Sequence, residues 1–165
     1  MSRLLERLHK YKDDRGMMAN LRCVHVESKK HRAWPALNRL GVPINDRVKA
    51  FVAGLFAVHP EDTSTGRNFG ATCKVIEKER GDNSDDKKLT PTERRFQHLL
   101  TADTPAELHD RVLRLVLLAR SQKVPIPVNY AKLERDLKAW GDRTKIEWAS
   151  SFWAVKPSPD KEEAT

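Results

Sequence analysis

Two segments in the second half of this 165-residue chain carry complete helix-start signals. Residues 90–93 read TPTE and residues 104–107 read TPAE, so each places threonine at the cap, proline first in the helix and glutamate third. The cap hydroxyl accepts a bond from an unpaired backbone N–H, proline lacks the N–H that would be unpaired there, and the glutamate can reach back to the cap. The second half is therefore expected to be built from helices.

The spacing of apolar residues predicts an all-α protein, because no stretch alternates apolar and polar residues as a β-strand would. Helices are expected near residues 2–12, 16–25, 30–40, 46–58, 67–80, 91–101, 105–121, 129–140 and 142–154. Residues 105–121 are apolar on two sides, which predicts a central helix. Asn45 and Asp142 are candidate caps, and the last helix is expected to bury Ile146, Ala149, Phe152 and Trp153.

The polar segment 81–89, which begins with a helix-ending glycine, is interpreted as a linker between two lobes. The predicted domains are an N-terminal helical lobe at residues 1–80 and a C-terminal four-helix bundle at residues 90–155. Residues 156–165 contain two prolines and are expected to form a disordered tail.

The charge favours a polyanionic partner. The net charge is +8, and the first 80 residues carry 16 Lys or Arg against 9 Asp or Glu. Neutralising phosphates releases counterions and dominates non-specific affinity for nucleic acid, although a solvated lysine-rich surface would give the same charge.

Three features of the sequence bear on the cellular compartment, and they favour the cytoplasm. No apolar run approaches the ~20 residues that cross a bilayer, and residues 1–6 do not resemble a signal peptide. The two cysteines, Cys23 and Cys73, are far apart, so ordinary thiols in a reducing cytoplasm are expected.

No catalytic constellation is evident, so we expect neither an enzyme nor a metal or other cofactor. The histidines lack HxxxH or HExxH spacing; they are His9, His25, His31, His59, His98 and His109. The aspartate pairs at 13–14 and 85–86 could hold a metal in a nuclease, but they lie in polar segments typical of solvated turns.

Aromatic and basic residues are the candidates for binding. Trp34, Trp140, Trp148 and Trp153 could stack on bases, although the last three lie on apolar stripes and are expected in the core. Several cations stand at expected helix starts, where the helix dipole disfavours them, or along one edge of the central helix. These candidates are Arg47, Lys49, Arg94, Arg95, Arg111, Arg114, Arg143 and Lys145. Each pair could instead form exposed salt bridges worth under about 1 kcal/mol, but the repeated pattern favours a path for phosphates.

The order of short motifs resembles the CasB family, the small subunit of the type I-E CRISPR surveillance complex called Cascade. The resemblance covers about residues 15–155. It is carried by ERRF at 93–96, LL at 99–100, AD at 102–103, VPI at 124–126, DL at 136–137, WG at 140–141, WA at 148–149 and FW at 152–153, preceded by GMMANLR at 16–22, AWPAL at 33–37, LFAVHP at 55–60 and NFG at 68–70.

The resemblance implies a non-catalytic, cytoplasmic subunit. In Cascade such subunits pair along the inner side of the complex, beside the large subunit and the guide-bound backbone, and hold the displaced non-target DNA strand. Arg95, Arg114, Arg143 and Arg47 fall on basic positions of the family, and Arg22 is a further addition. Thr101 and Asp142 stand where relatives can carry basic residues.

Three alternatives remain at this point. A purely structural assembly subunit would use its basic surface to bind other subunits only. A metal-dependent nuclease would cleave DNA, and a free-standing transcription regulator would require a recognition helix, which no segment singles out.

Overall fold

Helices account for nearly all of the structure. The computed structural model describes residues 2–82 and 88–154. In order these residues form α1 (Arg3–Lys10), α2 (Arg15–Arg22), η1 (Cys23–His25), η2 (Glu27–Ala33), α3 (Trp34–Arg39), α4 (Arg47–Val58), α5 (Phe69–Arg80), α6 (Pro91–Leu100), α7 (Pro105–Arg120), α8 (Tyr130–Lys138) and α9 (Asp142–Phe152), where η denotes a 3-10 helix. The all-α prediction is confirmed for this part of the chain. The middle of the expected linker and the expected tail at residues 156–165 lie outside the described residues.

Both helix-start signals are confirmed. The Thr90 hydroxyl accepts from the Glu93 backbone N–H at 3.0 Å, and the Glu93 carboxylate accepts from the Thr90 N–H at 3.0 Å. At α7 the Thr104 hydroxyl accepts from the Glu107 N–H at 3.2 Å, but the Glu107 carboxylate accepts from the Asp103 N–H instead of the cap. Each signal therefore starts a helix, and the first is a full reciprocal capping box.

Other local predictions were wrong. The cap of α4 is Asp46, not Asn45, because the Asp46 carboxylate accepts from the Lys49 N–H. Gly141 precedes α9, so Asp142 is its first helical residue and makes no side-chain cap.

The buried face of α9 also differs from the expectation. It runs through Thr144, Trp148 and Phe152, four residues apart, which leaves Ile146 on the opposite face and 65% exposed. Trp153 follows the helix and remains 36% exposed.

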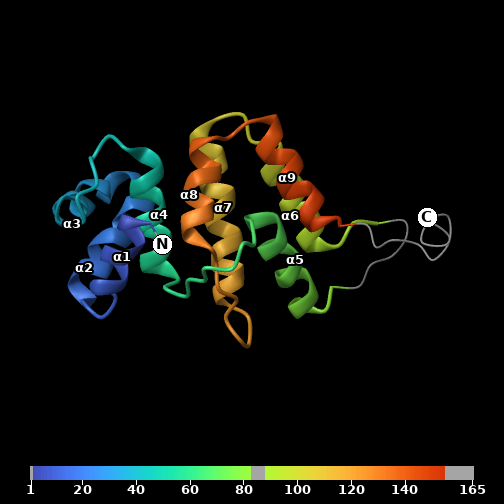
Figure 1. Cartoon of the computed structure of the whole chain (residues 1–165), viewed down its shortest axis with the longest axis horizontal. Coiled ribbons are helices and arrows are strands. Elements are labelled where there is room, and N and C mark those ends of the chain that lie inside the picture. The colour runs from blue at the N-terminus through green and yellow to red at the C-terminus, as the bar shows by residue number, and fades with distance from the viewer. Residues whose placement is uncertain (1, 83–87, 155–165) are drawn as a thin grey trace.

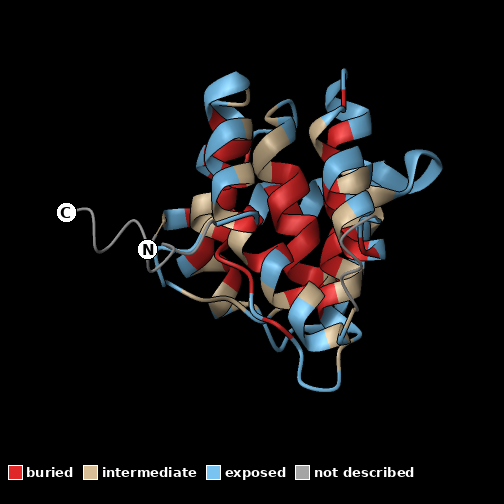
Figure 2. Cartoon of the chain, turned by 90° about the vertical axis from the view of Figure 1, so that its right-hand side faces the viewer, coloured by how far each residue is buried: buried red, intermediate tan, exposed pale blue. Residues whose placement is uncertain are grey.

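A single large hydrophobic cluster runs from Leu4 to Phe152 and includes residues of every α-helix. Helix α7 contributes Leu108, Val112, Leu115 and Val116 to this cluster and packs on α4, α5 and α6. Figure 2 shows buried segments on the inner faces of the helices and exposed segments around them.

Spatial neighbours do not follow chain order. Helices α1 to α4 gather at one side of the molecule, α7 and α8 lie in the middle, and α5, α6 and α9 lie at the other side (Figure 1). A boundary at residue 81 would separate α5 from α6, α7 and α9, on which it packs, while α8 packs on α4. The division into two lobes stays a prediction.

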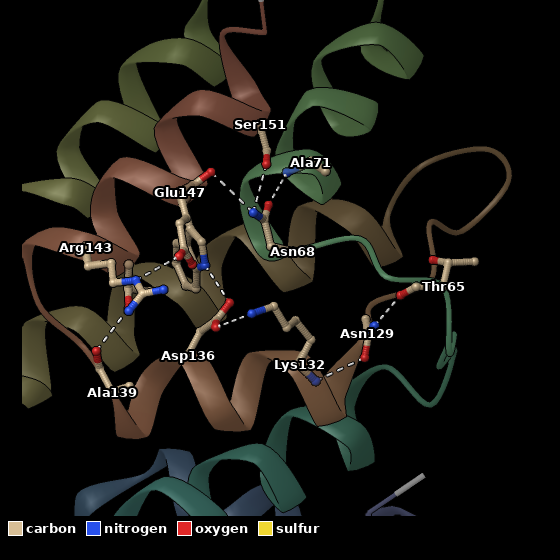
Figure 3. A network of polar contacts seen from close by, with 12 residues as sticks. Thr65, Asn68, Ala71, Asn129, Lys132, Asp136, Ala139, Arg143, Glu147 and Ser151 are labelled. Carbon is tan, nitrogen blue, oxygen red and sulfur yellow. Dashed lines mark hydrogen bonds and ion pairs between the residues drawn. The ribbon is translucent and has the colours of Figure 1, made fainter.

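Helices α5 and α9 approach each other closely. A Cβ atom on Gly70 would overlap the Trp148 carbonyl oxygen, so only glycine permits this approach. Beside it, the Asn68 side chain accepts from the Ala71 N–H at 3.0 Å to cap α5, and donates to the Ser151 hydroxyl at 2.8 Å on α9 (Figure 3). The NFG segment therefore both starts α5 and docks it on α9.

Trp148 connects α9 to α8. Its side chain is fully buried, and its indole N–H donates to the buried Asp136 carboxylate at 2.8 Å. The other Asp136 oxygen accepts from Lys132 at 2.8 Å, which compensates the buried carboxylate (Figure 3). The middle of α9 is thereby held against the last turn of α8.

We expect Gly70→Ala to lower the free energy of unfolding by at least about 2 kcal/mol, because the added methyl group must push α5 away from α9. Urea denaturation monitored by circular dichroism measures it. Gly66→Ala is the matched control, because nothing lies within 4 Å of a Cβ there, and it should change stability by less than about 0.5 kcal/mol. Equal stability of the two variants would contradict the packing described here.

Candidate nucleic-acid interface

The starts of three helices lie at one end of the molecule. Two contacts show that α4 and α7 run parallel. His109 stacks on Phe51 near the starts of the two helices, with ring centroids 4.1 Å apart, and Arg120 donates to the Val58 carbonyl near their ends. Helix α8 ends at the same place, since Lys138 contacts the Asp46 cap at 3.3 Å. Helix α9 begins four residues later, and Figure 1 shows α4, α7 and α9 all starting at the upper end.

Four of the predicted residues lie at this end, and we call them the basic end: Arg47, Lys49, Arg143 and Lys145. Arg47 is exposed, and the Arg143 side chain is 94% exposed and pairs with Glu147 at 3.3 Å. Lys145 lies over the Trp140 ring, 6.0 Å from its centroid, and Lys49 is half-buried. The positive ends of the α4 and α9 dipoles add to the charge of these cations, whereas the Asp46 carboxylate and the negative end of α8 at the same place partly offset it.

Three more predicted arginines meet in a hollow between α6 and α7. It is lined by Arg95, His98, Glu107, Asp110, Arg111 and Arg114. Helices α6 and α7 are antiparallel neighbours, which brings Arg95 in the first half of α6 opposite the middle of α7. The predicted residues therefore form two groups, the basic end and this α6–α7 hollow.

The arginines of the hollow differ in what they already bind. Arg111 donates to the His98 carbonyl at 2.7 Å and to the Thr101 hydroxyl at 3.2 Å, and it pairs with Glu107 at 3.4 Å. Its side chain is only 18% exposed, so it fastens the end of α6 to α7. Arg114 is 74% exposed and makes a surface ion pair with Asp110, which a phosphate can replace at little cost.

Two predicted cations lie apart from both groups. Arg94 is exposed in the first turn of α6 and does not line the hollow. Arg22 donates to the Ala57 carbonyl at 3.0 Å, so it satisfies the end of α4, opposite the basic end. Among residues 2–82 and 88–154, no ion pair engages Arg47, Arg94 or Arg95.

Sequence reasoning missed Lys138. It lies in the last turn of α8, where a lysine is ordinary because it favours the helix dipole. Only the fold shows that this turn ends beside the start of α4. The nearby glycine at position 141 marks the end of the helix but gives no sign of its neighbour.

Other chemistry is sparse in the described residues. They contain no group of three side chains suited to hold a metal ion. Burial raises the pKa of the Cys73 thiol well above its usual value, which disfavours the reactive thiolate. No described helix has the length and apolar character needed to span a membrane.

Substituting Arg111 and Arg114 of α7 should lower the free energy of unfolding by different amounts. Arg111→Ala removes contacts that fasten α6 to α7 and should lower the free energy of unfolding by about 1.5–3 kcal/mol. Arg114→Ala removes one exposed ion pair and should lower it by less than about 0.5 kcal/mol. Thermal and urea denaturation measure both, and a larger loss for Arg114→Ala would contradict the assignment of Arg111 as the structural residue.

A family model and a solved structure both relate this chain to the Cse2 family. The sequence matches the family of the CRISPR-associated protein Cse2 over residues 17–153. A Cse2-family protein from Thermus thermophilus has a similar crystal structure, with a TM-score of 0.69, 21% identity, and coverage of 92% of this chain and 94% of that one. No curated protein matches this sequence.

Two further crystal structures are similar. CasB from Thermus thermophilus has a TM-score of 0.69 and 19% identity, covering 94% of this chain and 100% of that one. CasB from M. ruber has a TM-score of 0.63 and 24% identity, covering 99% of this chain and 97% of that one. The matched residues extend from α2 to the end of α9, and the chain therefore belongs to the Cse2 family of CRISPR-associated proteins.

Proposed function

We propose that this chain is the non-catalytic small subunit of a type I-E Cascade complex, where it holds the displaced non-target DNA strand and stabilises the R-loop. Membership of the Cse2 family supports the assignment to such a complex. The observation that carries the strand-holding role is that α4 and α9, each with two cations near its start, begin at the same end of the molecule.

The mechanism is electrostatic. Pairing of the guide RNA with one DNA strand is nearly balanced in energy against the DNA pairing that it replaces, so modest contacts to the displaced strand shift the balance. The basic end and the α6–α7 hollow offer cations that would bind phosphates along the backbone. Such contacts carry no sequence information, which leaves specificity to the guide.

The path follows from the placement of α7. Asp110 lines both the α6–α7 hollow and a larger cavity that Arg47 also lines, so these two depressions share a wall. A strand that crosses the first half of α7 would pass from Arg47 to Arg114 and Arg95. In the complex, partners include the large subunit, the guide-bound backbone subunits and a second copy of this chain, whose cations would extend the path.

We expect single-stranded DNA to bind the isolated protein with a steep dependence on salt. Arg47→Ala/Arg114→Ala/Arg143→Ala removes three phosphate contacts and should reduce the slope of log K against log salt by roughly 2, since each contact to a single strand contributes about 0.7. Fluorescence anisotropy of a labelled strand across a salt series measures this, with Mg²⁺ present to reveal any cleavage.

The matched control is Lys12→Ala/Arg15→Ala/Lys123→Ala, which removes the same charge from exposed positions that line neither depression. It should retain the native slope. If the native protein does not bind, or if both triple variants lose affinity equally, the strand-holding proposal is wrong. Absence of binding by the native protein would favour a purely structural assembly subunit. Cleavage of the strand would indicate a nuclease.

A further inference from the structure

A cavity of about 440 Å³ opens beside the basic end and is lined in part by Arg47. Three separate segments form its walls: residues 24–37 around η1, η2 and α3, residues 44–51 at the start of α4, and residues 106–113 at the start of α7. The lining residues that bear on its possible ligand are Trp34, Ile44, Arg47, Phe51, His109 and Asp110. We call it the Trp34 pocket.

Aromatic rings line the interior. His109 lies flat on Phe51 with an interplanar angle of 2°, and His25 meets the same ring edge-on, with centroids 5.6 Å apart. Burial lowers the pKa of His109 to about 4, with a further contribution from the nearby Arg47 charge, and burial also lowers the pKa of His25. Both rings are therefore uncharged at neutral pH, and the inner wall suits a flat, neutral ligand.

Large apolar side chains remain in water at the mouth. Trp34 is 41% exposed and Ile44 is 52% exposed, whereas Leu37 on the same wall is buried. Covering exposed apolar surface is favourable at about 25 cal/mol per Å². The indole of Trp34 offers a flat face to a ligand that enters beside it. The His31 ring meets the indole edge-on, with ring centroids 6.2 Å apart.

The charged residues at the mouth of the pocket differ in whether they form ion pairs. Lys30 pairs with Glu27 at 2.7 Å, and Asp110 pairs with Arg114 at 3.1 Å. Arg47 stands at the start of α4 and makes no ion pair within the described residues. The pocket thus combines an uncharged aromatic interior with one available cation at its edge, as a nucleotide requires.

We propose that the Trp34 pocket takes up one unpaired nucleobase of the displaced strand, stacked against Trp34, while Arg47 binds the adjacent phosphate. The inference rests on the proposed function, because it assumes that the strand reaches the basic end. A base has apolar faces for the aromatic walls and polar edges for the Asp110 and Glu27 carboxylates and the imidazoles. Continuity with the cations of the basic end favours a nucleic-acid strand over a polypeptide as the occupant.

Base capture would add to phosphate binding in a specific way. A base held in the pocket cannot stack or pair with its former partner, so the strand is hindered from re-annealing at that nucleotide. Stacking on an aromatic side chain is tolerant of sequence, because every base has a π-face. The pocket would therefore anchor the strand at one point without selecting a base.

The test compares a 12-nucleotide oligothymidylate with an abasic strand of the same length and charge, using the full chain and equilibrium anisotropy. The native protein should bind the thymidylate strand about 10-fold more tightly, because one stacked base contributes about 1–3 kcal/mol. Trp34→Ala should lose this preference while its affinity for the abasic strand stays within about 2-fold. Trp153→Ala, the matched control with 36% exposure on another surface, should retain the preference.

A second measurement does not depend on a variant. A strand carrying 5-bromodeoxyuridine, irradiated on the native protein, should form an adduct on Trp34 that peptide mapping locates. Equal affinity of the native protein for both strands, or a preference that survives Trp34→Ala, would overturn the base pocket and leave the strand-holding proposal intact. Failure of the native protein to bind either strand would overturn the proposed function as well. An adduct elsewhere and none on Trp34 would also overturn the base pocket.

Discussion

The arrangement of this molecule depends on how Trp148 is held. Its backbone carbonyl lies against Gly70 of α5, and its indole N–H is bound to the buried Asp136 of α8. These two contacts fix α9 between helices that come from distant parts of the chain. Because α8 also ends at the Asp46 cap of α4, the start of α9 is placed at the same end as the start of α4. Packing in the core thus places the cations of those two starts at the same end of the molecule.

Placing cations at helix starts has a local electrostatic cost, and this cost is an argument for the proposed role. The positive end of the helix dipole repels a lysine or arginine there, and exposed ion pairs such as Arg143 with Glu147 compensate only weakly. A phosphate would be attracted by the helix end and by the cation together. The Trp34 pocket lies beside this end, so phosphate binding and base stacking could act on the same strand.

Much of the fold was predictable because its signals are local. The TPTE and TPAE segments start α6 and α7 as expected, and the apolar spacing of residues 105–121 correctly indicated a helix with a buried stripe through Leu108, Val112, Leu115 and Ala119. The errors were also local: Asp46 was a better cap than Asn45, and the buried stripe of α9 follows Thr144, Trp148 and Phe152 instead of Ile146. Each error is a shift of one or two residues, which is enough to move a side chain to the other face of a helix.

The site was predictable only in its residue types. Repeated cations at helix starts are visible in the sequence, but whether those starts lie at the same end of the molecule depends on contacts such as that of α8 with α4, which no local pattern encodes. The same limit hid Lys138 and the Trp34 pocket, whose walls come from three separated segments. It also made Arg111 look equivalent to Arg114, although Arg111 is committed to the carbonyl of His98.

We propose that the displaced strand passes over the end of the molecule where α4, α7 and α9 begin. Photo-crosslinking can locate this path, with 4-thiothymidine placed at successive positions of the non-target strand in an assembled, guide-loaded complex. We expect adducts in peptides that contain residues 46–49, 105–114 or 142–146. Adducts confined to α1, α2 or the end of α5, or none on this chain while the guide is fully paired, would contradict it.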